Sequence, residues 1–232
     1  MTALEESAFF PMALSLLSYA AGGAVHRRFR IALCNPLLLA VLFTMGALAV
    51  LGIPYETYYA GAHHLSWLLT PATICLAVPL YDRRRELRAH WRAIGAGIAA
   101  GTAVTMGCVF LMSHACGLSY VAYATLLPKS ITAAIGMDVS AGLGGNVPLT
   151  AAAIILTGIL GNMFAPAWCR LFRLTDPTAR GIAIGSASHA IGTAKAAEMG
   201  ETEGAMSSLA MVVTGLATVA VVPFFAALFP GG

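Results

Sequence analysis

The chain has 232 residues, of which 59% are hydrophobic and 10% are charged, and its mean hydropathy is +0.81. A soluble domain carries roughly 25% charged residues, so this composition excludes an ordinary soluble protein and indicates an integral membrane protein. The formal net charge is only +3, and the basic residues lie in short loops, which argues against a nucleic-acid partner and for the lipid bilayer.

Apolar segments long enough to cross a bilayer as helices recur along the chain. They predict an all-α polytopic membrane protein with about six transmembrane helices, in which residues 1–232 form one integral membrane domain. The expected spans are residues 7–25, 31–51, 64–81, 93–112, 147–169 and 205–225.

Charges in the loops predict the orientation of these spans. Arginines follow the first, third and fifth spans, whereas loops 53–63 and 114–119 contain no Lys or Arg. Because loops rich in Lys and Arg stay in the cytoplasm, we expect a multi-pass protein whose N-terminus lies outside.

Two segments do not fit this topology as ordinary spans. Residues 120–146 must begin and end outside, and residues 181–199 begin inside and precede a span that leaves from inside. Each is too short to cross twice, and each is interrupted by Pro or Gly. We therefore predict two re-entrant hairpins with tips near the midplane, where protein or water must satisfy the non-helical backbone. A broken helix that crosses the bilayer is the alternative.

A short internal repeat is consistent with this architecture. Residues 68–73 (LLTPAT) resemble residues 126–132 (LLPKSIT), and each motif is followed by a Gly- and Ala-rich span. Inverted repeats with interrupted helices are typical of secondary transporters. We predict such a repeat, with halves of about 31–118 and 119–229.

The second repeat motif combines a cation with hydroxyl groups. Pro128 suits the first turn of a new helix. The N-terminus of that helix would then carry Lys129, Ser130 and Thr132. Free N–H groups and the helix dipole favour an anion there, so the motif predicts a carboxylate-binding site. The alternative is a structural kink with a lysine that reaches the membrane interface.

Other residues near these motifs have two interpretations each. Thr70 and Thr73 form the matching half-site of the first repeat, or they belong to an ordinary Pro kink. Asp138, two turns beyond Lys129, either pairs with that lysine in proton coupling or gating, or reaches the outer surface. Asn162 either faces the substrate or joins two helices by hydrogen bonds.

The second hairpin carries a small polar surface. His189 titrates near neutrality, so it is a candidate proton carrier as well as a ligand; the alternative is a histidine hydrogen-bonded within a helix interface. The other candidate ligands are Ser186, Ser188, Gly192 and Thr193.

Charged residues, one lysine and three glutamates, lie at the end of this hairpin and just after it. Lys195 and Glu198 are spaced to pair at i, i+3, as a neutralised charge pair or as a gate. Glu201 and Glu203 are expected to begin the last helix near water. Neither a P-loop, a catalytic triad nor metal-ligand spacing is evident, so we expect no enzymatic activity, no cofactor and no metal.

Several blocks of the sequence resemble the LrgB/CidB family, also called the murein-hydrolase-export-regulator family. The long block at residues 185–195, GSASHAIGTAK, is the most specific of them. The others are residues 69–73, 77–81, 127–132, 156–161, 176–181 and 203–211. The sequence departs from the family pattern at Lys195, where many members carry Arg, and at Ala133-Ala134, which replace a more usual Thr-Pro pair.

The resemblance implies a protein of the bacterial inner membrane that works beside a small LrgA/CidA-type membrane protein. Family members are described as holin/antiholin-like regulators of murein hydrolases and autolysis, or as small-monocarboxylate transporters that include the plastid glycolate/glycerate translocator. We expect a secondary transporter of pyruvate, glycolate or glycerate by alternating access, coupled to protons and forming a homo-oligomer. The alternative is a regulator of murein hydrolase activity without selective transport.

Overall fold

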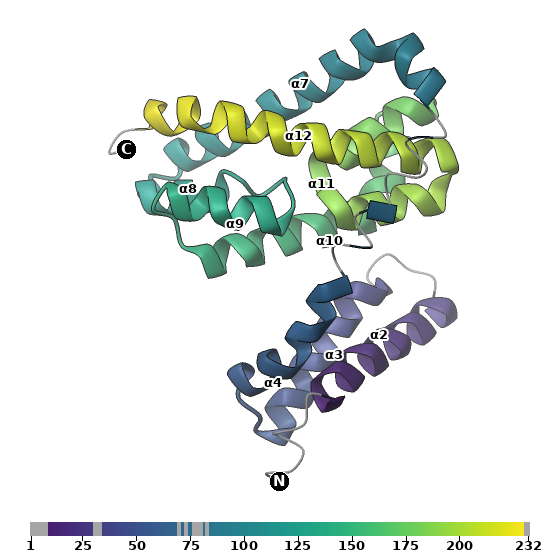
Figure 1. The fold of residues 1–232 in the computed structure, drawn as a ribbon, viewed down its shortest axis with the longest axis vertical. Coiled ribbons are helices and arrows are strands. Elements are labelled where there is room, and N and C mark those ends of the chain that lie inside the picture. Colours follow the sequence, from purple (N-terminus) through teal and green to yellow (C-terminus); the bar gives the residue numbers. More distant parts are fainter. Residues whose placement is uncertain are drawn as a thin grey trace. The chain divides into compact units, whose positions relative to one another are not determined.

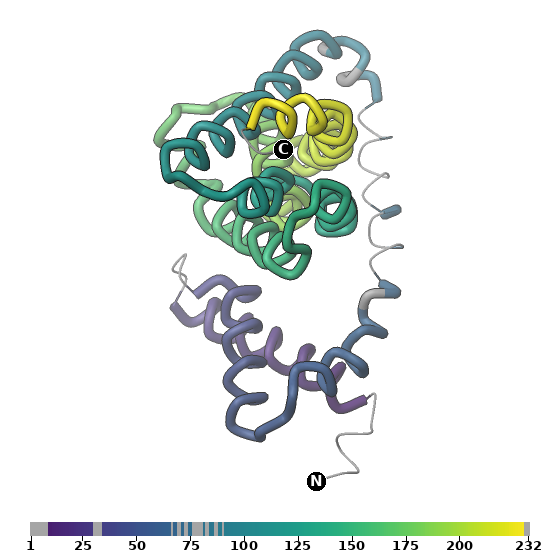
Figure 2. Tube along the Cα trace, turned by 90° about the vertical axis from the view of Figure 1, so that its left-hand side faces the viewer, coloured from purple at the N-terminus to yellow at the C-terminus, as the bar shows by residue number. Residues whose placement is uncertain are grey.

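The structure is a computed structural model that describes residues 9–29, 34–68, 71, 74–75, 81 and 84–229. Every regular element in this part of the chain is helical, which confirms the all-α fold class. The chain divides into two compact units, Met1–Leu76 and Ala77–Gly232, whose helices are drawn in Figures 1 and 2.

The first unit contains three α-helices and a 3-10 helix in its described part. They are α2 (Phe9–Phe29), α3 (Pro36–Leu51), α4 (Tyr55–Ala62) and η2 (His63–Leu68). The Asn35 side chain caps α3 by accepting the N–H of Leu37 at 2.9 Å, and the helix ends at Gly52, whose φ of 65° is left-handed. Gly22 lets α2 approach α3, because an added methyl group would lie 2.7 Å from the Pro36 carbonyl oxygen.

The first unit agrees only in part with the predicted spans. Helix α2 matches the span expected at residues 7–25. Helix α3 has 16 residues, about 24 Å at 1.5 Å per residue, which is short for a hydrocarbon core of about 30 Å. The span expected at residues 64–81 begins within η2, and most of it, with Thr70 and Thr73, lies outside the described residues.

The second unit contains the remaining described helices. They are α7 (Arg84–Ala115), α8 (Tyr120–Leu126), α9 (Ala133–Gly142), α10 (Val147–Leu171), α11 (Pro177–Met199) and α12 (Glu201–Leu228). Helix α11 packs between α10 and α12, and α7 contacts both α11 and α12 (Figure 1). Buried Ile94 and Ile98 of α7 meet Met206 and Ala210 of α12.

Among the described residues, four helices are long and apolar enough to cross a membrane. They are Phe9–Phe29, Trp91–Ala115, Val147–Leu171 and Glu201–Leu228. These helices support a membrane protein and match four of the expected spans. The total of about six spans and the inverted repeat stay predictions, since most of the first repeat motif lies outside the described residues.

Residues 120–146 fold back as a pair of short helices. Helices α8 and α9 have 7 and 10 residues, about 10 and 15 Å, so neither could cross a bilayer. The Asn146 N–H donates to Thr125 Oγ1 at 2.8 Å, which returns the chain to α8. The Thr150 hydroxyl of α10 lies 2.6 Å from Ser140 Oγ and 3.0 Å from the Thr125 carbonyl oxygen, and it fastens the hairpin to α10.

The prediction that Pro128 opens the second helix of this hairpin is wrong. The Lys129 N–H bonds to the Leu126 carbonyl at 3.1 Å, so Pro128 lies in the last turns that continue α8. A proline has no N–H to continue the helical ladder, and the chain leaves the helix soon afterwards. Thr132 is extended, with φ −63° and ψ 146°, and occupies the position just before α9, which begins at Ala133.

Helix α11 forms the second hairpin, because it breaks and folds back at His189, where φ is 41° and ψ is −143°. Its arms touch, since a methyl group added at Gly192 would lie 3.1 Å from Ile184 Cγ2. Both arms also pack on α12. A methyl group at Gly181 of the first arm would lie 2.7 Å from Met206 Cβ, and one at Gly204 of α12 would lie 2.9 Å from the second arm.

Candidate functional site

The tip of α11 rests on the middle of α10. His189 Nε2 lies 2.9 Å from the Ile154 carbonyl oxygen. Because a carbonyl oxygen can only accept a hydrogen bond, Nε2 must carry the proton. The imidazole covers Gly158, where an added methyl group would lie 2.6 Å from Cε1. Asn162 Nδ2 donates to the Ile191 carbonyl at 2.8 Å. Since Ile154, Gly158 and Asn162 are spaced four residues apart, one face of α10 holds the tip.

The other polar residues predicted for this tip are buried, and Thr193 is the one for which hydrogen bonds within the described residues are found. The Thr193 hydroxyl donates to the His189 carbonyl at 2.9 Å and lies 2.9 Å from Ser207 Oγ of α12. Ser188 packs against Gly161 of α10. The structure therefore brings the predicted residues together, but as packing between helices. For Asn162 and His189, the interhelical hydrogen bond is the interpretation that the structure supports.

The polar groups at the tip of the α8–α9 hairpin have fewer hydrogen-bond and ion-pair partners. Lys129 is half-buried, and its Nζ donates to Ser130 Oγ at 3.3 Å. Within the part of the chain that the structure describes, Lys129 takes part in neither of the ion pairs. Thr132 makes no side-chain hydrogen bond to the start of α9, so the first N–H groups of this helix remain available.

A small cavity lies beside this tip. Its volume is about 10 Å³, close to the space that one water molecule requires. Five hydroxyl-bearing residues line it: Thr102 and Thr105 of α7, Ser130 of the tip, and Thr214 and Thr218 of α12. Thr214 Oγ1 is buried and has no hydrogen-bond partner among the described residues. The cavity therefore offers an unused donor and acceptor next to Lys129.

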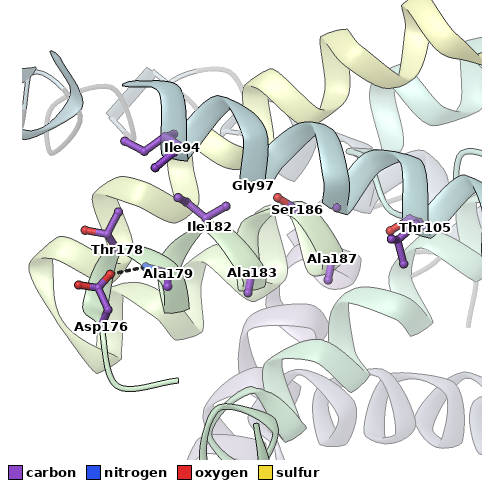
Figure 3. A pocket seen from close by; sticks show the side chains of 13 residues that line it. Ile94, Gly97, Thr105, Asp176, Thr178, Ala179, Ile182, Ala183, Ser186 and Ala187 are labelled. Carbon is purple, nitrogen blue, oxygen red and sulfur yellow. Dashed lines mark hydrogen bonds between the residues drawn. The ribbon is translucent and has the colours of Figure 1, made fainter. Parts of the chain in front are cut away.

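A larger groove of about 580 Å³ runs between α7 and the first arm of α11 (Figure 3). Asp176 and Thr178 lie at one end, and Thr105 and Ser186 lie at the other. The Ser186 hydroxyl is on the side of α11 that faces α7, and no described group bonds to it. Thr105 lines both this groove and the small cavity, so the two spaces adjoin at α7.

The two hairpin tips converge on Ile154 of α10. Its carbonyl oxygen accepts from His189, and its side chain occupies the space beside Gly136. Gly136 also adjoins the Pro128 carbonyl oxygen, which would lie 3.3 Å from an added methyl group. Lys129 is close enough to His189 for an electrostatic interaction. The candidate site thus lies near the middle of α7, α10 and α12, between the two tips.

The comparison with known families agrees with this architecture. A model of the LrgB-like family matches residues 15–228, nearly the whole chain. The chain belongs to the LrgB-like family. This family is membrane-associated and linked to murein hydrolase regulation or transport. No solved structure matches the chain.

Some predicted residues of this LrgB-like protein lie away from the tips. Asp138 is exposed on α9, in agreement with the surface interpretation. Lys195 and Glu198 form the expected pair at 2.8 Å, but the Glu198 side chain is 68% exposed, so this pair neutralises no deeply buried charge.

Sequence reasoning missed the hydroxyl groups of α7 and α12. Isolated threonines in apolar helices are usually structural, and none of these four stands in a recognised motif. Their spacing could have revealed them, because Thr102 and Thr105 are three residues apart and Thr214 and Thr218 are four apart. Each pair therefore shares one face of its helix.

Glu201 and Glu203 stand in the first turn of α12, as expected, and Glu201 is exposed, but the expectation that Glu203 lies near water is wrong. Glu203 is 7% exposed and lies 3.6 Å from Arg180, whose Nε donates to the Leu174 carbonyl at 2.7 Å. The first arm of α11 approaches the backbone of Glu203 at Gly181, and the carboxylate itself lies beside Gly200. Glu203 therefore holds the open end of the α11 hairpin to α12.

Proposed function

We propose that this LrgB-like protein is a secondary transporter of small monocarboxylates of the pyruvate, glycolate and glycerate class. The observation that supports this most is Lys129, a half-buried ammonium group without an acidic partner among the described residues. A cation buried without a counter-charge is costly, so the site favours an anionic ligand.

Donors around Lys129 suit a carboxylate. Ser130 and Thr132 flank the start of α9, whose first N–H groups can bind an anion. Thr214, which lines the small cavity together with Ser130, contributes a hydroxyl group that has no partner among the described residues, and Ser186 contributes another at the inner end of the groove. A carboxylate accepts several hydrogen bonds, and charge-assisted bonds of this kind are roughly twice as strong as neutral ones.

The proposed mechanism is alternating access, with the substrate held between the hairpin tips near the midplane. The groove gives access from the end that carries Asp176, near the arginines that the positive-inside rule places in the cytoplasm. We assign proton coupling to His189, because Glu198 is exposed and paired with Lys195. A small LrgA/CidA-type partner in the bacterial inner membrane and a homo-oligomer complete the proposal.

Uptake of labelled pyruvate and glycolate into proteoliposomes tests this function, with and without the small partner and an imposed pH gradient. Lys129→Met removes the charge and keeps an unbranched side chain. We expect saturable uptake by the wild type and a loss of at least about 100-fold in Lys129→Met, since a charged hydrogen-bonding partner is removed from a buried site. Lys195→Met is the matched control, because Lys195 is paired near the surface, and it should transport normally.

Three other results would change the proposal. Wild-type substrate affinity in folded Lys129→Met would remove Lys129 from the site. Non-selective leakage would indicate a pore. No uptake under any condition, with folded protein confirmed, would favour the regulator of murein hydrolases.

A further inference from the structure

We propose that the groove between α7 and the first arm of α11 binds the hydrocarbon chain of longer aliphatic monocarboxylates, with their carboxylate at the Ser186 end. This inference rests on the proposed transport function and extends its substrate class. A three-carbon acid leaves most of a groove of about 580 Å³ unfilled, whereas pockets of this size typically hold much larger ligands.

The polar groups of the groove are confined to its two ends. Between them the walls are apolar, formed by Ile94 and Gly97 of α7 and by Ile182 and Ala183 of α11 (Figure 3). From Thr178 to Ala187 the groove follows α11 for about 14 Å at 1.5 Å per residue, enough for a chain of about eight carbons. A ligand with one polar head and an apolar chain matches this distribution.

The inner end has the chemistry of a carboxylate site. Ser186 is 4% exposed, and its hydroxyl has no partner among the residues described. A buried hydroxyl without a hydrogen bond is unfavourable, and a carboxylate oxygen would accept a hydrogen bond from it. Gly101 lies over it, since an added methyl group would be 3.3 Å from Ser186 Cβ. Thr105 connects this end to the cavity beside Ser130, which bonds to Lys129.

The outer end sets the direction of the ligand. Asp176 caps α11 by accepting the Ala179 N–H at 2.8 Å, so its carboxylate is held at the mouth of the groove. Like charges repel, so the carboxylate of the ligand avoids this end and lies toward Lys129. The hydrocarbon chain then extends over Ile182 toward Asp176.

Two glycines of α7 provide a matched pair of variants. A methyl group added at Gly97 would lie 3.6 Å from Ile182 Cγ2 in the groove, whereas Gly95 has nothing within 4 Å. Gly97→Leu therefore fills the groove, and Gly95→Leu adds the same side chain to the same helix outside it. Both substitutions raise helix propensity equally, so differences between them report on the groove.

The experiment measures equilibrium binding of labelled octanoate to the purified full chain, and competition by acids of three to ten carbons. In the wild type we expect affinity to rise about two- to fourfold per CH₂ up to about eight carbons, because each buried CH₂ adds apolar contact. Gly97→Leu should lose at least about tenfold in octanoate affinity, whereas its pyruvate affinity, measured by the same equilibrium binding, should stay within about twofold because a three-carbon acid does not reach Gly97. Gly95→Leu should match the wild type, and Ser186→Ala should weaken both acids.

If affinity does not change with the number of carbons in the acid, in a protein that transports pyruvate, this inference is overturned and the proposed function is left intact. Equal chain-length dependence in Gly97→Leu and Gly95→Leu would assign octanoate to the lipid-facing surface and also overturn it. If pyruvate and glycolate are not transported but octanoate binds in a Gly97-dependent way, the groove is a ligand site and the proposed substrate class is wrong.

Discussion

The two hairpins of the second unit differ in how many of the polar side chains at their tips have partners inside the protein. At the α11 tip, His189, Thr193 and Asn162 each bond to a group inside the protein, and glycines of α10 make room for them. At the α8–α9 tip, Lys129 has only a hydroxyl partner and adjoins a cavity where Thr214 is unpaired among the described residues. Both tips are polar in sequence, but the buried charge and the unpaired cavity hydroxyl lie at the second, whereas on α11 the unpaired Ser186 hydroxyl faces the groove instead of α10.

This difference separates a supporting tip from a binding tip. His189 has a positive φ, which is unfavourable for a non-glycine residue and persists only where the surrounding structure fixes it. Its hydrogen bond to Ile154 and its contact with Gly158 supply that constraint. We therefore interpret the α11 tip as the rigid wall against which the α8–α9 tip holds the substrate.

The largest expected effect on stability comes from disturbing the supporting tip. In Gly158→Ala the new methyl group would lie 2.6 Å from His189 Cε1, so the ring or the helix must move. We expect a loss of about 1–3 kcal/mol in the free energy of unfolding, measured in detergent micelles. Gly107→Ala on α7 is the control, because it has nothing within 4 Å. Equal stability of the two variants would show that the tip does not rest on α10.

Two isosteric substitutions compare the tips directly. Thr193→Val removes the bond to the His189 carbonyl and the contact with Ser207, and we expect it to cost about 1–3 kcal/mol of unfolding free energy. Thr214→Val removes a hydroxyl without a described partner, so stability should be unchanged or slightly raised. Substrate affinity should fall in Thr214→Val. A large loss of stability there would mean that Thr214 is structurally paired, which would place it outside the binding site.

The sequence predicted the helical class, four helices that are long and apolar enough to cross a membrane, and the two segments where the chain folds back, because hydrophobic length and interrupting Pro or Gly are local properties. That these segments re-enter the bilayer stays a prediction. The sequence did not separate the roles of the tips, because the pairing of His189 with Ile154 joins residues 35 positions apart. The burial of Glu203 could not be predicted from the neighbouring sequence either, since it depends on the approach of α11 to α12. The groove also required the fold, because its walls come from α7 and α11.

The smallest effect is expected at the surface pair of the second hairpin, and it tests which group carries the proton. Glu198 is exposed and bonds to Lys195 at 2.8 Å, so Glu198→Gln should change the free energy of unfolding by less than about 0.5 kcal/mol. Because the pair lies away from the two tips, uptake driven by a pH gradient should also persist. His189→Asn is the informative comparison, since asparagine keeps a hydrogen-bond donor but does not titrate. If Glu198→Gln abolishes gradient-driven uptake and His189→Asn preserves it, the coupling role belongs to the surface pair, and the α11 tip is a support alone.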